Sequence, residues 1–139
     1  MSGGLSHARM RELFEEMVTA FGRMELDRFQ SFMTADAIYE WPYLPVPGWP
    51  HRMQGTAEFA AMTAKGMADF GGLNHKVRRF YDLVEPDTLI VEYYSDTVHG
   101  PSGRRYANEY LGIVRFEGEK MSYWKEYIVP SRVAAVMGA

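Results

Sequence analysis

The sequence predicts an α+β fold, with helices in the first half of the chain and a run of strands in the second. Two patterns support this prediction. Apolar residues recur at spacings of three and four up to about residue 33, whereas the chain after residue 72 forms four segments rich in β-branched and aromatic residues, separated by turn signals. With 139 residues the chain can bury one hydrophobic core. We therefore expect a single domain spanning residues 1–139.

The first predicted element is a helix over Leu5 to Met24, because its apolar residues occupy one helical face. These residues are Met10, Leu13, Phe14, Met17, Val18 and Phe21. Gly22 lies near the end of this helix, where glycine is common. The same spacing continues through Leu26, Phe29 and Met33 and predicts a short second helix that ends near residues 34–36.

An aromatic strand, Ala37 to Tyr43, is expected next. It runs into a loop, Pro45 to Pro50, in which proline restricts the backbone. Helical spacing returns after Gln54, where Thr56 can cap a third helix that the pair Gly71-Gly72 ends. This helix crosses between the first strand and the later ones.

Four long strands complete the predicted fold, at residues 73–83, 88–98, 104–116 and 120–129. The breaks between them contain the turn signals Glu85-Pro86-Asp87, His99-Gly100-Pro101-Ser102-Gly103 and Glu117-Gly118-Glu119. Strands joined by such short turns pair as antiparallel hairpins, so we expect an antiparallel meander.

The amino-acid composition limits the ligands, partners and locations expected for this protein. Aromatic residues make up 14% of the chain, enough to line a large core, an interface or a cavity for a flat ligand. The formal net charge is −3, with 15 basic and 18 acidic residues spread along the chain, which argues against nucleic acid as a partner. The chain has no cysteine and no apolar run of membrane-spanning length. We expect no membrane association and a cytoplasmic location.

Three stretches of the sequence resemble the nuclear transport factor 2-like superfamily, in its SnoaL-like polyketide cyclase and ketosteroid isomerase branch. They are residues 33–42, the Arg52-Met53-Gln54-Gly55 sequence that opens a helix, and the region from Tyr106-Ala107-Asn108 to Lys125-Glu126-Tyr127. The resemblance implies a cystatin-like cone, in which a curved antiparallel sheet wraps around N-terminal helices and encloses an internal pocket.

The resemblance also argues against ketosteroid isomerase activity. The position of the isomerase's aspartate base matches Trp41, that of its oxyanion-hole tyrosine matches Met17, and that of its protonated aspartate matches Gly112. None of these side chains can remove a proton or stabilise an enolate as that enzyme does.

Two other branches of the superfamily match only in part. Limonene-epoxide hydrolase resembles the chain at Tyr39 and Glu126, but its arginine and its other aspartate match Tyr93 and Ser95. Phenazine-biosynthesis proteins resemble it at Tyr106, Asn108 and Glu126-Tyr127, but their histidine and serine match Met62 and Gly66. Glu126 is thus the one acid that both resemblances imply.

Strand alternation predicts which side chains share the pocket with Glu126. If Glu126 faces inward, so do Ser122, Trp124 and Ile128. The resemblance places the further inward residues on the other strands, namely Tyr39, Trp41, Tyr93, Ser95, Tyr106, Asn108, Tyr110 and Gly112. A carboxylate among these rings and neutral groups is desolvated, which raises its pKa and suits it to proton transfer. The alternative is that Glu126 is held by an asparagine, a phenol or an arginine and only orders its strand.

The neighbours of Glu126 are candidate substrate-binding residues. Tyr39, Trp41, Tyr93, Tyr106 and Trp124 can hold a flat ligand, with Ser95 and Asn108 as polar contacts; the alternative is that the rings are core and that Asn108 satisfies a backbone group. His51 is a further candidate, because the proline loop before it is expected to border the pocket mouth. The four histidines of the chain are far apart in the sequence, and no two have the spacing of a metal site. We therefore expect neither a metal nor a cofactor.

Two functional hypotheses follow. The first is a cofactor-independent isomerase, cyclase, lyase or dehydratase that uses Glu126 for proton transfer on a small hydrophobic cyclic or aromatic substrate. The second is a non-catalytic ligand-binding or assembly domain, because each fuller catalytic set implied by resemblance is incomplete. A homodimer is expected in either case, since the predicted outward strand positions carry Tyr94, Leu111, Ile113, Tyr123 and Tyr127. The alternative is that residues 130–139 cover this face.

Overall fold

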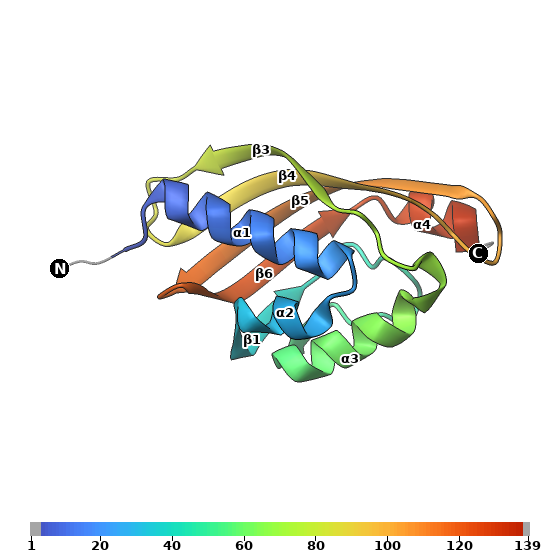
Figure 1. Cartoon of the computed structure of the whole chain (residues 1–139), viewed down its shortest axis with the longest axis horizontal. Helices are drawn as coiled ribbons and strands as arrows, with labels where there is room; N and C mark the ends of the chain where they lie inside the picture. The colour runs from blue at the N-terminus through green and yellow to red at the C-terminus, as the bar shows by residue number, and fades with distance from the viewer. Residues whose placement is uncertain (1–3, 138–139) are drawn as a thin grey trace.

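The computed structural model describes residues 4–137 and places helices against one face of a curved sheet (Figure 1). Three helices come early, α1 (His7–Gly22), α2 (Leu26–Ser31) and α3 (Thr56–Gly66), with a 3-10 turn η1 (Ala68–Phe70) after them. The strands are β1 (Met33–Glu40), β2 (Arg52–Gln54), β3 (Lys76–Asp82), β4 (Thr88–Val98), β5 (Arg105–Glu117) and β6 (Lys120–Ile128). A last helix, α4 (Pro130–Met137), follows β6. The predicted α+β class is confirmed.

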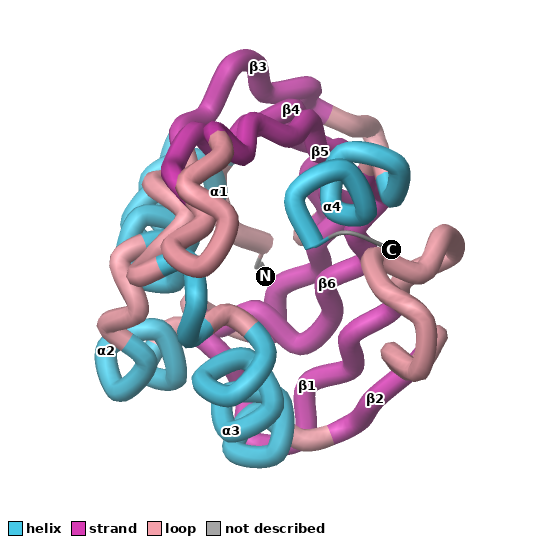
Figure 2. The backbone as a smooth tube through the Cα atoms, turned by 90° about the vertical axis from the view of Figure 1, so that its right-hand side faces the viewer, coloured by secondary structure: helices cyan, strands magenta, loops and turns pink. Residues whose placement is uncertain are grey.

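The six strands form one sheet in the order β2-β1-β6-β5-β4-β3. Strands β3 to β6 pair in sequence as the predicted antiparallel meander. The pairing of β1 differs from the prediction of a wholly antiparallel sheet, because β1 runs parallel to β6, with Tyr39 opposite Trp124. Viewed from the side, the sheet bends around the helices in the expected cone (Figure 2).

The core lies between the concave face of the sheet and the apolar face of α1. Phe14, Met17 and Val18 on that face are fully buried. The Phe14 ring lies 5.4 Å from the ring of Tyr93 on β4 and 6.2 Å from that of Trp124 on β6. Ser6 caps the helix by accepting a hydrogen bond from the Arg9 backbone nitrogen. The helix therefore supports the residues that form the floor of the cone.

Three segments differ from the sequence prediction. The second helix ends at Ser31 and β1 already begins at Met33, since Met33 pairs with Met121 of β6. Strand β2 has only three residues, too few for a periodic pattern. No helix was predicted for the residues of α4, which were considered only as a possible cover for the outer face of the sheet. The described part of α4 lies toward the interior, where Val133 and Val136 are buried, and not on the outer face of the sheet.

A close crossing of α1 and the segment before β3 depends on glycine. A Cβ on Gly22 would lie 2.6 Å from the backbone nitrogen of His75, closer than real contacts allow. The carbonyl oxygen of Gly22 accepts hydrogen bonds from the backbone nitrogens of Leu73 (2.6 Å) and Asn74 (3.1 Å). Gly72, with φ of 116°, supplies the turn that brings these residues to the helix end. This crossing fixes the position of His75 at the start of β3.

Candidate functional site

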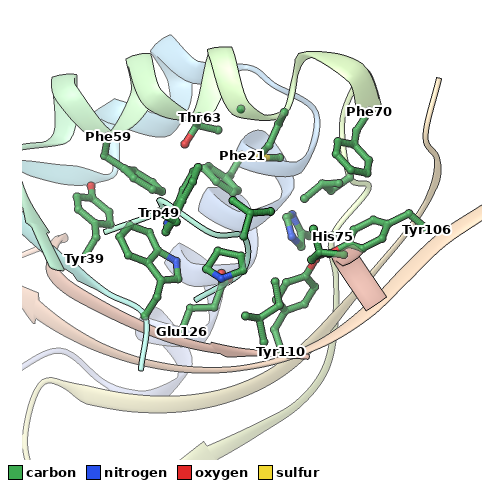
Figure 3. A pocket seen from close by; sticks show the side chains of 18 of the residues that line it. Phe21, Tyr39, Trp49, Phe59, Thr63, Phe70, His75, Tyr106, Tyr110 and Glu126 are labelled. Carbon is green, nitrogen blue, oxygen red and sulfur yellow. Dashed lines mark hydrogen bonds between the residues drawn. The ribbon is translucent and has the colours of Figure 1, made fainter. Parts of the chain in front are cut away.

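A cavity of about 280 Å³ opens between the sheet, α3, the proline loop and α4. Its wall is mostly aromatic and aliphatic, with Glu126, His75, Thr63 and three phenols as polar groups (Figure 3). The cavity is at the lower end of the size range for small-molecule sites. The lining residues are Phe21, Tyr39, Trp41, Pro45, Val46, Trp49, Phe59, Thr63, Gly66, Met67, Phe70, Leu73, His75, Tyr106, Tyr110, Trp124, Glu126, Ile128, Val133 and Met137.

Glu126 is held at the pocket floor by a chain of hydrogen bonds. The Trp124 indole nitrogen donates to the Tyr93 hydroxyl (3.0 Å), which in turn donates to Oε2 of Glu126 (2.5 Å). Gly112 lies opposite Glu126 on β5. A Cβ at Gly112 would lie 3.0 Å from the Tyr93 ring and 3.2 Å from the Trp124 nitrogen, so glycine leaves the room that this chain needs.

The carboxyl group of Glu126 has no cationic partner among the ion pairs of residues 4–137. Burial therefore dominates and raises the pKa of Glu126 from its usual 4.5 to about 7, while hydrogen bonds from Tyr93 and Trp41 act in the lowering direction. Glu126 is half-buried, and its exposed part faces the cavity. Of the sequence-based alternatives for what holds Glu126, the phenol is the one present, since the Tyr93 hydroxyl donates to Oε2, and no arginine pairs with this carboxyl group within residues 4–137.

A second polar network runs behind the pocket wall. The hydroxyls of Ser95 and Tyr110 lie 2.7 Å apart, and those of Tyr106 and Tyr110 lie 3.3 Å apart. The amide of Asn108 donates to the Tyr106 hydroxyl (2.7 Å) and to the Val129 carbonyl (3.1 Å), and its oxygen accepts from backbone nitrogens. Asn108 thus satisfies backbone groups, which was the structural alternative to ligand binding.

The predicted site residues divide into two groups. Glu126, Tyr39, Trp41, Tyr106 and Trp124 line the cavity. The other four, Tyr93, Ser95, Asn108 and His51, are not part of its wall. The first three are inward-facing and buried as predicted, but their polar atoms are bonded to pocket residues or backbone. The ring of His51 is exposed, and its Nδ1 lies 2.9 Å from the Trp41 carbonyl oxygen.

His75 is a pocket residue that the sequence analysis missed. Its side chain is nearly fully buried, with 5% of the residue exposed, and burial lowers the pKa of the imidazole to about 3, so the ring is neutral at ordinary pH. Among residues 4–137 its Nδ1 is enclosed without a hydrogen-bond partner, as are Nε1 of Trp49 and Oγ1 of Thr63 on the same pocket wall. No periodic pattern marks His75, because it is a lone histidine just before the first residue of β3, Lys76.

Within residues 4–137 no group of three or more His, Cys, Asp or Glu side chains is arranged to hold a metal ion. None of the helices in the described region is long and apolar enough to cross a membrane.

Comparison with known proteins agrees with the fold. The family model described as the SnoaL-like domain matches residues 14–124. An uncharacterized PhzA/B-like protein from Pseudomonas aeruginosa is 25% identical over 103 residues, which cover 74% of this chain and 72% of the relative.

Solved structures share the same architecture at low sequence identity. A candidate isomerase from Bacillus subtilis superposes with a TM-score of 0.85 at 17% identity, covering 94% of each chain. A Catenulispora acidiphila protein with a ketosteroid isomerase-like fold, in complex with trimethylamine, gives a TM-score of 0.75 at 16% identity, covering 91% of this chain and 92% of that one. At these identities the likeness concerns the fold.

Proposed function

The chain belongs to the SnoaL-like domain family, and from this premise we propose that it is a cofactor-independent isomerase, cyclase, lyase or dehydratase. Its substrate is a small hydrophobic cyclic or aromatic molecule held in the aromatic pocket. The observation that carries the proposal is Glu126, a carboxyl group on the cavity wall that has a pKa raised to about 7 and no cation paired with it within residues 4–137. A group whose pKa lies near the working pH transfers protons most effectively.

In the proposed reaction Glu126 removes a proton from one atom of the substrate and returns it to another. The Tyr93 hydroxyl donates to Oε2 of Glu126, and the carboxyl group lies on the cavity wall, where a substrate can reach it. The Tyr39–Phe59 stack, with ring centroids 4.1 Å apart, and the Trp41 and Trp49 rings, 5.5 Å apart, offer apolar surfaces for a flat molecule. Neither an electron acceptor nor a second substrate is needed, because proton transfer is redox-neutral.

The direct test of this proposal is the titration of Glu126. Infrared or carbon NMR spectra of protein labelled at the glutamate carboxyl carbons are expected to contain one carboxyl group that titrates near pH 7, far above the others. This signal should be missing in Glu126→Gln. A parent protein whose glutamates all titrate near 4.5 would remove the basis for proton transfer by Glu126.

A second candidate is a non-catalytic domain that binds a small ligand, and one observation favours it. A relative of the same fold is in complex with trimethylamine, and an unpaired carboxylate among aromatic rings is suited to a small ammonium ion. The same titration discriminates between the two. A bound cation favours the ionised form, so trimethylammonium should lower the pKa of Glu126 if the pocket is a cation site and leave it unchanged otherwise.

We also propose that the protein forms a homodimer through the outer face of the sheet. Tyr94, Leu111, Ile113, Tyr123 and Tyr127 are half-buried on this face. Cationic side chains lie over three of the rings, Arg78 over Tyr94, Arg115 over Tyr123 and Lys125 over Tyr127. Aromatic rings covered by arginine and lysine side chains of the same chain are suited to an interface that is partly apolar and partly polar.

Light scattering at micromolar concentration is expected to give twice the chain mass of 15.9 kDa. The variant Leu111→Glu places a charge in the middle of the proposed interface and should yield monomers that melt at nearly the parent temperature. A parent protein that scatters as a monomer contradicts the proposal.

A further inference from the structure

We infer that Trp49 sets the size limit of the cavity, so the substrate has at most three fused six-membered rings and a four-ring molecule is excluded. The inference rests on the proposed function, since it takes the cavity beside Glu126 as the substrate site, but it does not depend on how Glu126 acts. Trp49 lies in the proline loop and lines the cavity on the side of Tyr39 and Phe59, away from Phe70 (Figure 3).

The proline loop positions Trp49. Its two ends are tied together by the residues that flank it, because the Trp41 backbone nitrogen donates to the His51 carbonyl oxygen (2.8 Å) and Nδ1 of His51 lies 2.9 Å from the Trp41 carbonyl oxygen. Inside the loop the Trp49 backbone nitrogen donates to the Val46 carbonyl oxygen (3.2 Å), and both side chains line the cavity. The prolines of the loop restrict its backbone further. Trp49 is therefore part of a wall that is formed before a ligand arrives.

The six-membered part of the Trp49 indole fits against a residue without a side chain. A Cβ on Gly66, the last residue of α3, would lie 3.1 Å from Cζ3 and 3.6 Å from Cη2 of Trp49. The ring of Trp41 meets that of Trp49 edge-on, 5.5 Å away and with an angle of 84° between the planes. Trp49 therefore spans the distance from Trp41, which follows β1, to the end of α3, and it closes this side of the cavity.

Packing alone keeps the indole of Trp49 in place. Its Nε1 is enclosed without a hydrogen-bond partner within residues 4–137, and the residue is half-buried. A smaller side chain at this position would therefore break no hydrogen bond. The volume that the ring leaves would join the cavity, so an effect on ligand size can be separated from an effect on folding.

The size limit follows from the volume of the cavity. At the packing density of protein interiors, about 0.74, a cavity of about 280 Å³ holds roughly 200 Å³ of ligand atoms. This is room for two or three fused six-membered rings and too little for four. Because the wall is mostly apolar, a ring system that fits gains from the burial of its surface, whereas a larger one must leave part of that surface in water.

Binding is tested with three phenols of increasing size, 2-naphthol with two rings, 9-phenanthrol with three and estradiol with four. Equilibrium dialysis with the parent protein is expected to show binding of the first two. The affinity for estradiol should be lower by at least about tenfold, because extra atoms forced into a packed site are costly. Estradiol that binds the parent protein as tightly as 2-naphthol overturns the size limit.

The variant Trp49→Ala should extend the limit to four rings. Estradiol is expected to gain about 10–100-fold in affinity because the wall retreats, whereas 2-naphthol should lose about 2–10-fold because one aromatic face is gone. A general loss of stability cannot change two affinities in opposite directions. Tyr43→Ala is the matched control and should leave both affinities unchanged, because Tyr43 precedes the same loop but is 59% exposed and is not part of the cavity wall.

A second substitution tests the contact with Gly66. In the Trp49→Ala background, Gly66→Leu adds a side chain that starts 3.1 Å from the former position of Cζ3 and refills the vacated space. Leucine also suits a helix better than glycine. The double variant should again exclude estradiol, and an estradiol affinity as high as in Trp49→Ala alone contradicts the inferred contact. If Trp49→Ala does not fold, Trp49→Leu keeps more of the packing and supports the same comparison.

The outcomes separate this inference from the proposed function. Glu126→Gln keeps the volume of its side chain and should show the same size limit as the parent protein. A size limit set by Trp49 together with a Glu126 that titrates near its usual 4.5 leaves this inference standing and overturns only the proposed proton transfer. An estradiol affinity that does not respond to Trp49→Ala overturns the size limit alone. A parent protein that binds none of the three phenols also overturns it, while the titration of Glu126 still judges the proposed function separately.

Discussion

Replacing Glu126 by glutamine is expected to lower turnover of the substrate by about two to four orders of magnitude, the usual contribution of a positioned acid or base. Glutamine keeps the volume of the side chain and can still accept the hydrogen bond from Tyr93, but it cannot exchange a proton. Ligand binding should therefore change little while the rate falls. The measurement is the turnover rate of the two purified proteins on the same substrate.

The same substitution should not destabilise the protein. In the folded state the pKa of Glu126 is raised to about 7 from the usual 4.5, so folding favours the protonated form. Below pH 4.5 the carboxyl group is protonated in both states and carries no penalty. As the pH rises through 7 the parent protein loses stability, by about 3 kcal/mol at most, and Glu126→Gln escapes this loss. Thermal melts should agree at pH 4 and favour the variant at pH 8.

A matched control separates this effect from a general loss of negative charge. Glu109 lies on the outer face of β5 and pairs with Arg78, and Glu109→Gln should alter neither the rate nor the pH dependence of melting. A Glu126→Gln variant that melts clearly below the parent at pH 8 would mean that the carboxylate stabilises the fold. A structural role would then replace the catalytic one.

Truncating Phe14 to alanine should cost about 3–5 kcal/mol of unfolding free energy, the usual range for a fully buried phenylalanine. Phe14 has no exposed surface, and its ring packs against Tyr93, Trp124 and Phe80. For a domain of this size the melting temperature should fall by about 10–20 °C, measured by calorimetry or circular dichroism. The expected loss is large because the cavity is left where α1 meets the sheet.

Phe14→Leu serves as the comparison, since it keeps most of the buried volume and should cost less than half as much. Phe14 does not line the pocket, but Tyr93 and Trp124, which hold Glu126, rest on it. The alanine variant should therefore also disturb the titration of Glu126. A melting temperature unchanged in Phe14→Ala would contradict the packing of α1 on the sheet.

Strand alternation was sufficient to identify much of the pocket before the structure was known. Once Glu126 faces inward, the period of two places Ser122, Trp124 and Ile128 beside it; the structure has Glu126, Trp124 and Ile128 on the cavity wall but not Ser122, which lies beside an irregularity in the β5–β6 pairing. The same rule could not separate the wall from the layer behind it. Tyr93, Ser95 and Asn108 face inward, but their polar atoms are occupied by Glu126, Tyr110 and Tyr106.

The sequence by itself determined the α+β class and the four-strand meander, because helical and strand periodicity and turn residues are local properties; the inward position of Glu126 was implied by the family resemblance. Only the tertiary structure decided that β1 pairs in parallel with β6, that the described part of α4 closes over the pocket and that His75 completes its wall. Each of these depends on contacts between residues far apart in the chain. The clearest example is His75, whose place depends on how closely Gly22 lets a distant segment approach the end of α1.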